Sequence, residues 1–162
     1  MDENRGNHKS ANAISTLRDF LTSIGWEPEP TEDGLGFEID FGPPHLPIAS
    51  ALAAISSHDQ FVIYFNFGLA APEDRRAEVA QFMVRANWNL IIGNFEMDYD
   101  DGLMHFRSSV GFAGGELTEV LLRNVVLSAM KAVEFYADGL LEVVSSRKNA
   151  MQAITDIQKS SN

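Results

Sequence analysis

Residues Gly93–Ser109 read GNFEMDYDDGLMHFRSS, with apolar and polar side chains alternating on both sides of Asp101 and Gly102. An Asp-Gly pair between two alternating runs predicts a β-hairpin with a two-residue type I′ turn, which needs positive φ at both central positions. In this register two complementary pairs face each other across the strands: Asp98 with His105, and Glu96 with Arg107. The aromatic and methionine side chains share the other face, so we expect two antiparallel strands with one core side.

The acidic side chains of this hairpin also suggest a calcium site or a catalytic Asp-His pair. A calcium loop of the EF-hand type needs oxygen ligands at positions 1, 3 and 5 before its glycine at position 6. Counting back from Gly102 places Met97 and Tyr99 at the first two of these positions, so the register fails. A carboxylate can orient an imidazole as a base, but Asp98 and His105 have no nucleophile beside them. We therefore favour solvated cross-strand pairs.

Composition and charge restrict the partners of the chain. Its 162 residues suit one domain, and 23 acidic against 12 basic residues give a net charge of −11. Binding to nucleic acid or to anionic membranes needs clustered basic side chains, so neither partner is expected. The chain has no cysteine, no apolar run of signal-peptide type near its start and none long enough to span a membrane. We expect a cytoplasmic protein.

The N-terminal part predicts a helix followed by a strand. Residues 1–11 are polar and aperiodic and are expected to be disordered. Apolar side chains at helical spacing then predict a helix over Ala11–Ile24, with Gly25 as its stop. The alternating run LGFEIDF, residues 35–41, predicts a strand.

Two further strands are expected over residues 46–57 and 60–68. The first is rich in alanine, and we interpret it as a strand because its neighbour QFVIYFNFG is strongly β-prone. In that neighbour the odd-numbered residues 61 to 67 form the core face, while Val62 and Tyr64 make the opposite face apolar too. A covering segment of the chain is the favoured explanation, and a partner surface is the alternative.

A second helix begins at Pro72. Its expected buried stripe has helical spacing and comprises Val79, Phe82, Met83, Ala86 and Leu90. Trp88 falls at the edge of this stripe, where core packing is the favoured role and a binding platform the alternative. Together with Val62 and Tyr64, Trp88 is our candidate partner-binding residue.

A long third helix is expected after Thr118, a suitable N-cap residue. Its apolar surface is broader than one stripe, which indicates heavy burial or a shared interface. Gly139 is expected to bend or end it, and Met151, Ile154 and Ile157 predict a helical tail over residues 145–162. The predicted fold is α+β in the order α-β-β-β-α-β-β-α, a single domain over residues 12–144 with a largely antiparallel sheet packed by helices.

No other segment carries a catalytic or metal-binding pattern. The four histidines are spread along the chain without a second histidine at ligand spacing. Gly111–Gly115 precedes a helix and could offer backbone amides to an anion, but it lacks a lysine, and Glu116 would repel phosphate. We expect no cofactor, no metal and no catalytic residues.

The chain resembles the YbjN domain family. The matching segments are LRDFLTSIGWEPE, then APEDRRAEVAQFMVRANWNLIIGNFEMDYDDGLMHFRSSV, then LTEVLLRNVV, and they cover about Leu17–Val143. The resemblance implies an α+β fold similar to that of type III secretion chaperones, which commonly work as dimers, and it implies no known catalytic residues. Two segments depart from the family pattern, namely the Pro- and Ala-rich Gly42–Ser57 and the longer tail after Val144.

Two functional hypotheses follow. The first is a non-enzymatic protein-interaction module, chaperone-like or regulatory, that forms a homodimer and binds a protein partner. The second is a small-ligand-binding protein or enzyme with a pocket near Trp88 and the Gly111–Gly115 loop.

Overall fold

The computed structural model describes residues 3–41 and 47–160, which form one six-stranded antiparallel sheet with helices beside it. The strands are β1 (Glu29–Pro30), β2 (Gly36–Asp40), β3 (Ile48–Ser56), β4 (Gln60–Ala70), β5 (Asn94–Met97) and β6 (Leu103–Gly111). They lie in the order β1-β2-β3-β4-β6-β5. The short β1 was not predicted, because two residues within a turn-rich segment give no alternating pattern.

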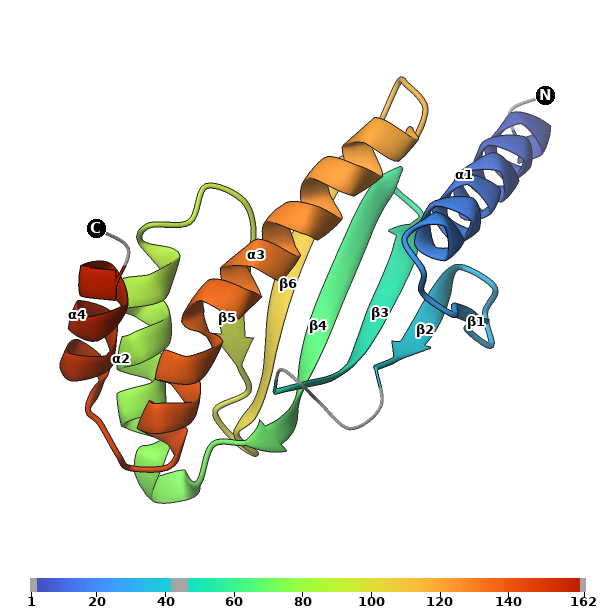
Figure 1. The fold of residues 1–162 in the computed structure, drawn as a ribbon. Coiled ribbons are helices and arrows are strands. Elements are labelled where there is room, and N and C mark those ends of the chain that lie inside the picture. Colours follow the sequence, from blue (N-terminus) through green and yellow to red (C-terminus); the bar gives the residue numbers. More distant parts are fainter. Residues whose placement is uncertain (1–2, 42–46, 161–162) are drawn as a thin grey trace.

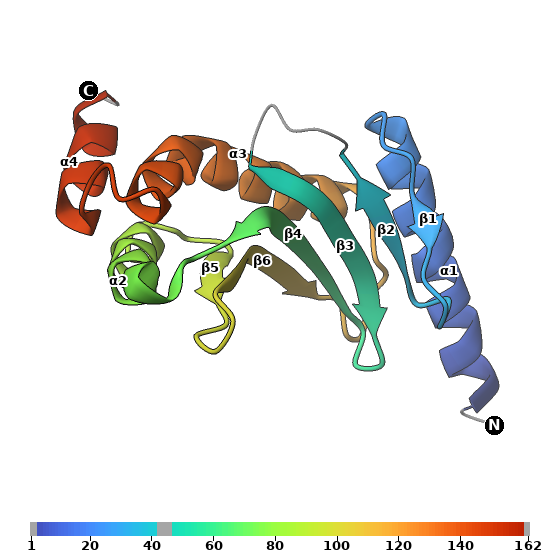
Figure 2. The ribbon, with the colours of Figure 1, turned by 90° about the horizontal axis from the view of Figure 1, so that it is seen from below.

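The helices are α1 (Glu3–Ser23), α2 (Arg76–Asn87), α3 (Glu119–Val144) and α4 (Ala150–Ser160), and a 3₁₀ turn, η1 (Glu73–Arg75), precedes α2. Helix α3 crosses the sheet on one side, α1 lies beside β2, and α2 and α4 lie beyond the β5 edge (Figures 1 and 2). The predicted single-domain α+β fold is confirmed.

The core lies between the sheet and the helices that cover one of its faces. As predicted, Phe61, Ile63, Phe65 and Phe67 are buried on β4. The alanine-rich segment is a strand, also as predicted. A bulge between Ile48 and Ser50 shifts its register. Ile48, and not Ala49, is therefore buried together with Ala51, Ala53 and Ile55.

The expected start of the first helix was wrong, because α1 begins at Glu3 instead of near Ala11. Residues 3–10 contain no proline, so nothing in the backbone prevents polar turns from extending the helix outward. The disorder expected for residues 1–11 stays a prediction. Residues 1–2 and 42–46 lie outside the described residues, and the domain limits at 12 and 144 stay a prediction.

Helix α3 begins as predicted and continues past Gly139. The Thr118 hydroxyl accepts a hydrogen bond from the Leu121 backbone N–H at 3.3 Å. A Cβ atom at Gly139 would lie 2.5 Å from the Ile157 Cδ1 atom and 3.1 Å from the Phe82 ring. The glycine therefore lets α4 and α2 pack closely against α3. Of the two outcomes expected at Gly139, a bend or an end of the helix, the end was wrong, because α3 continues to Val144.

The predicted hairpin exists, but its register and turn were wrong. The observed partners are Asn94 with Arg107, Phe95 with Phe106, Glu96 with His105 and Met97 with Met104. Asp98–Gly102 forms a longer loop in which only Gly102 has positive φ, so the turn is not type I′. The Asp98 and Asp101 carboxylates stabilise this loop by accepting hydrogen bonds from the Asp100 and Leu103 backbone N–H groups at 2.9 and 2.8 Å. The expected Asp98–His105 pair does not form.

Candidate functional site

One face of the sheet carries no helix or strand from residues 3–41 and 47–160. In Figure 2 helix α3 lies on the other side of the sheet. The centre of this face is apolar and half-buried, and it consists of Leu52, Ala54, Val62 and Tyr64, which we call the open sheet face. Among the described residues no helix or strand therefore provides the cover expected over Val62 and Tyr64, and both side chains are half-buried.

Strand pairing places the four apolar side chains side by side. Leu52 lies opposite Tyr64, and Ala54 lies opposite Val62. Sequence reasoning missed Leu52 and Ala54. The alternation in the alanine-rich strand was the signal that could have found them, because it places residues 52 and 54 opposite the buried set.

On the β6 side, the open sheet face is bordered by an ion-paired network around Glu96. The Glu96 carboxylate lies 2.8 Å from the His105 Nε2 atom and 2.6 Å from the Arg107 Nη2 atom. The Asn94 side-chain amide donates to the same carboxylate at 2.7 Å. The His105 ring also meets the Tyr64 ring edge to face, with 5.2 Å between centroids. This border is close to electrically neutral.

The network lowers the pKa of Glu96. Partial burial alone would raise the pKa of this carboxyl group, but the hydrogen bonds from Asn94 and His105 and the positive charge of Arg107 outweigh burial. The Glu96 carboxylate therefore stays ionised to lower pH than an ordinary glutamate.

On the β2 side, the open sheet face is bordered by carboxylates. Glu27, Glu29 and Glu38 line a hollow of about 540 Å³ that reaches Leu52. Glu29 lies directly opposite Glu38 across the β1–β2 pair, an arrangement that like charges disfavour. Within the described part of the chain none of these three glutamates forms an ion pair. This border therefore carries uncompensated negative charge.

Trp88 lies far from the core. It is 88% exposed, so its predicted core packing was wrong. Helix α2 ends at Asn87, directly before Trp88. Trp88 lies four residues after Val84, which is 70% exposed, so both side chains lie on the face opposite the buried stripe. Val84, Trp88, Tyr99 and Met151, which we call the Trp88 surface, line a hollow of about 910 Å³ between α2 and α4.

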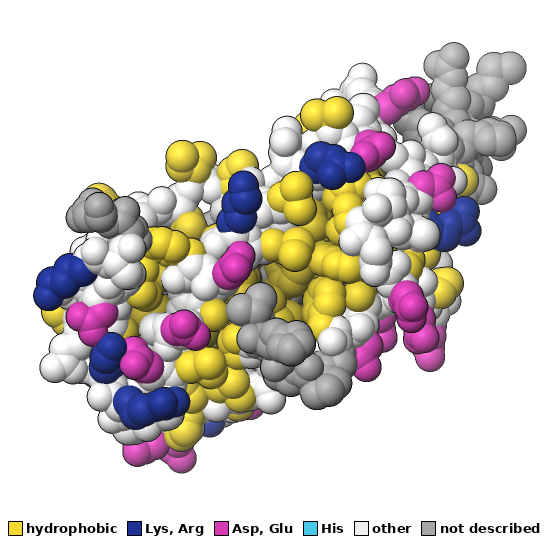
Figure 3. Space-filling view, in the orientation of Figure 1, with side chains coloured by type: hydrophobic (Ala, Val, Ile, Leu, Met, Phe, Trp, Pro, Cys, Tyr) yellow, Lys and Arg dark blue, Asp and Glu magenta, His cyan; other side chains and the backbone are white. Residues whose placement is uncertain are grey.

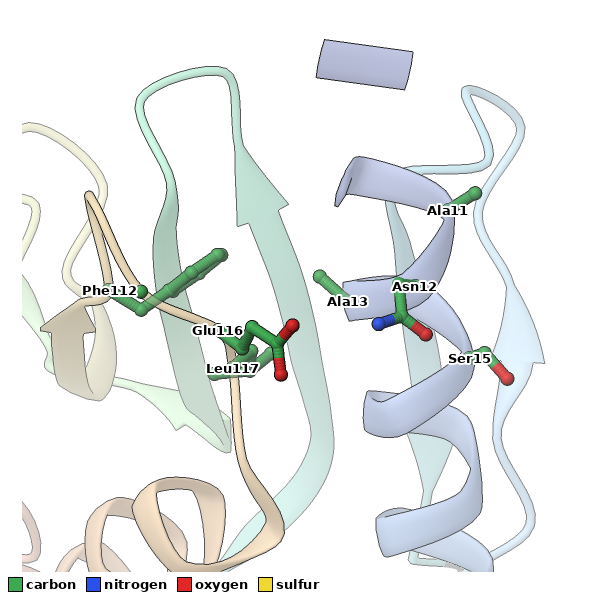
Figure 4. Close-up of a pocket in the computed structure, with 8 residues that line it drawn as sticks. Ala11, Asn12, Ala13, Ser15, Phe112, Glu116 and Leu117 are labelled. Atoms are coloured by element: carbon green, nitrogen blue, oxygen red, sulfur yellow. The ribbon is translucent and has the colours of Figure 1, made fainter. Parts of the chain in front are cut away.

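The Gly111–Gly115 loop belongs to a different hollow. A space of about 540 Å³ lies between this loop and α1, and Figure 4 shows Phe112 and Leu117 on the loop side with Ala13 across from them. None of the residues lining this hollow lines the hollow at Trp88. The expected ligand pocket formed jointly by Trp88 and the loop was therefore wrong.

The helix-covered side of the sheet shows apolar side chains as well. Hydrophobic atoms gather between α1 and α3 in Figure 3. Trp26, Phe41 and Met130 are partly buried apolar side chains that pack against the core. Trp26 and Phe41 contact each other edge to face at 5.0 Å. These side chains form the margin of the core.

The β5 edge of the sheet is closed by one side chain. The Asn87 side-chain amide donates to the Phe95 carbonyl at 3.0 Å and accepts from the Phe95 N–H at 2.8 Å. These two bonds occupy the backbone groups of Phe95, which an added strand would use. The other edge strand, β1, has only two residues.

No group of three or more His, Asp or Glu side chains within the described ranges could hold a metal ion. Among the described helices none is long and apolar enough to cross a membrane.

These features define an α+β protein with one covered and one uncovered sheet face. The YbjN family model, described as "Putative bacterial sensory transduction regulator", matches residues 13–142, and the chain belongs to this family. A search of curated proteins found no match.

Solved structures share the fold at low sequence identity. The crystal structure of YbjN from E. coli is similar with a TM-score of 0.55 and 12% identity, over 74% of this chain and 87% of that chain. The crystal structure of an uncharacterized protein from Methanothermobacter thermautotrophicus is similar with a TM-score of 0.53 and 12% identity, over 83% of this chain and 98% of that chain. The structure of the HopA1-SchA chaperone-effector complex is similar with a TM-score of 0.50 and 12% identity, over 76% of this chain and 93% of that chain. The expected family and the chaperone-like fold are confirmed.

Proposed function

We propose that this protein is a non-enzymatic protein-interaction module, chaperone-like or regulatory, that binds a protein partner on the open sheet face. The observation that carries the proposal is the uncovered apolar centre around Tyr64. An apolar sheet face gains free energy when another element covers it. A protein partner supplies that cover here.

The comparison with the HopA1-SchA complex supports a partner of this kind, since that structure is described as a chaperone with its effector. The closed β5 edge also favours binding on the face over strand addition at that edge.

Affinity purification from the native cell, followed by mass spectrometry, tests the proposal. We expect a reproducible protein partner that Tyr64→Asp loses, because the partner would have to remove water from the new carboxylate, which costs free energy. Ser109→Asp, on the exposed part of β6, is a second variant on the same face, and Glu134→Lys on α3 is the control on the other side. Circular dichroism must show intact folds. Binding that survives Tyr64→Asp would refute the assignment of the open sheet face.

We further propose that the protein is a homodimer and that the Trp88 surface mediates the contact. Large exposed apolar side chains at one place favour association. Arg85 lines the same hollow as Tyr99, whose neighbours Asp98 and Asp100 are exposed. In a two-fold contact each Arg85 can therefore meet the acidic loop of the second copy.

Light scattering of the purified protein tests the dimer. We expect twice the chain mass of 17.9 kDa at micromolar concentration. The double variant Val84→Ser with Trp88→Ser should give the single-chain mass, and the control Val120→Ser with Phe135→Ser, exposed apolar residues on α3, should stay dimeric. A wild-type mass of one chain would contradict the proposal.

The alternative of a small-ligand protein is not supported by a specific observation, since Trp88 and the Gly111–Gly115 loop line separate hollows. A thermal-shift screen against nucleotides, metal ions and metabolites tests it. The cytoplasmic location and the absence of nucleic-acid and membrane partners stay predictions, which cell fractionation and binding assays check.

A further inference from the structure

The open sheet face is chemically asymmetric along one row of residues. Strand pairing aligns Glu29, Glu38, Leu52, Tyr64 and Arg107 across five strands. The row therefore begins with two adjacent carboxylates, passes through the apolar centre and ends at a cation that Glu96 already neutralises at 2.6 Å. An occupant of this face meets negative charge on one side only.

The uncompensated carboxylates indicate the charge of the occupant. Glu29 and Glu38 repel each other across the strand pair, and Glu27 adds a third carboxylate at the same hollow. A cation placed there relieves the repulsion and gains attraction. The whole chain, with a net charge of −11, also attracts basic partners over longer distances.

The shape of the face indicates the conformation of the occupant. Four apolar side chains in two adjacent cross-strand pairs make a compact apolar area, which suits one α-helix of about 10 Å diameter. Strand addition is disfavoured, because Asn87 occupies the backbone groups of Phe95 at the β5 edge and β1 offers only two residues.

We propose that the open sheet face docks an amphipathic helix of a protein partner, with its apolar stripe on Leu52, Val62 and Tyr64 and with Lys or Arg side chains on Glu29 and Glu38. A second copy of this chain fits less well, because its open sheet face brings the same glutamates, and the described cation on that face, Arg107, is already paired with Glu96. This inference rests on the proposed function and specifies the partner.

Synthetic peptides test the inference on the full chain. The probe is a fluorescent helical peptide of about 14 residues, roughly four turns, with leucines on one face and lysines along both flanks. Two matched peptides replace the lysines by glutamates or the leucines by serines. Fluorescence anisotropy measures their affinities. We expect the leucine-lysine peptide to bind, and both matched peptides to bind at least tenfold more weakly.

Protein variants locate the binding. Glu29→Gln with Glu38→Gln should weaken the leucine-lysine peptide roughly fivefold to thirtyfold, as the loss of two partly exposed ion pairs predicts. Glu73→Gln with Glu134→Gln removes the same charge from exposed positions outside the open sheet face and should change the affinity less than twofold. Tyr64→Asp should abolish binding.

Each other outcome overturns the inference. Loss of binding with Tyr64→Asp but not with Glu29→Gln and Glu38→Gln would keep the open sheet face as a binding surface and refute the basic partner. If Glu73→Gln with Glu134→Gln weakened peptide binding as much as Glu29→Gln with Glu38→Gln, the peptide would be attracted only by the net charge of the chain, and the contact with Glu29 and Glu38 would be refuted. No binding of the leucine-lysine peptide, or a wild-type dimer that Tyr64→Asp converts to a single chain, would refute the helix and favour a second copy.

Discussion

At the scale of single residues, Ser108 stands out because it is a polar side chain in the core. It is 1% exposed, and among the described residues its hydroxyl has no hydrogen-bond partner. It points to the core side of β6, opposite Ile63. A buried hydroxyl without a partner costs free energy of folding.

Ser108→Ala should therefore raise the free energy of unfolding by about 1 kcal/mol. Urea unfolding followed by circular dichroism measures the change. Ser109→Ala, at the exposed neighbouring position, should stay within about 0.5 kcal/mol of wild type. A clear loss of stability for Ser108→Ala would show that the hydroxyl is satisfied in the folded protein.

Asn87 is expected to contribute more than an ordinary helix-end residue, because its amide bonds both backbone groups of Phe95. Asn87→Ala should lower the free energy of unfolding by about 2 kcal/mol, since two hydrogen bonds contribute about 1 kcal/mol each. Asn89→Ala, two residues along the chain and exposed, is the control. Similar unfolding midpoints for the two variants would contradict the proposed closure of the β5 edge.

Glu96 should make stability depend on acid pH. Its folded-state pKa lies below the ordinary value of 4.5, so its ionised form favours the folded state. That stability is fully present above pH 4.5 and is lost as the pH falls through the folded-state pKa. The stability difference between wild type and Glu96→Gln in urea should therefore shrink below pH 4.5. A difference that does not change with pH would contradict the assigned network.

At the scale of elements, the hairpin between β5 and β6 shows what a sequence pattern can and cannot predict. Alternation identified both strands and their core side, because a register error of two residues leaves each strand side chain on its face. The core-face position expected for Tyr99 was wrong, because Tyr99 lies in the loop and is 58% exposed. The turn type could not be predicted, because the carboxylates of Asp98 and Asp101 bind local backbone N–H groups and favour a longer loop. The same error assigned His105 to Asp98 instead of Glu96.

Gly102 connects this loop to the rest of the fold. Its φ is +82°, and an added Cβ atom would clash with the Ala71 carbonyl oxygen. Gly102→Ala should lower the free energy of unfolding by at least about 1 to 2 kcal/mol from the backbone conformation alone, and the clash adds to this loss. Gly114 also has positive φ but has open space around it, so thermal unfolding of Gly114→Ala measures the cost of the backbone conformation without the clash. Equal losses would mean that the contact with Ala71 contributes nothing.

At the scale of the whole molecule, the sequence predicted the fold class, the family and the buried face of β4, since these depend on periodicity and on family motifs. The uncovered face could not be predicted, because apolar residues at positions 62 and 64 give the same sequence pattern whether a helix of the chain or a protein partner covers them. Trp88 was misplaced for a similar reason. It lies within a few residues of the buried stripe of α2, but the helix ends at Asn87, and its ring stays in solvent.

The central claim is that a protein partner covers the open sheet face. Site-specific photo-crosslinking in the native cell tests it most directly, with p-benzoylphenylalanine replacing Tyr64 and, as a control, replacing Phe135, which is 47% exposed on α3. We predict that the probe at position 64 forms an adduct with a different protein and that the probe at position 135 does not form this adduct. Failure to form an adduct at position 64, or the same adduct at both positions, would contradict the claim.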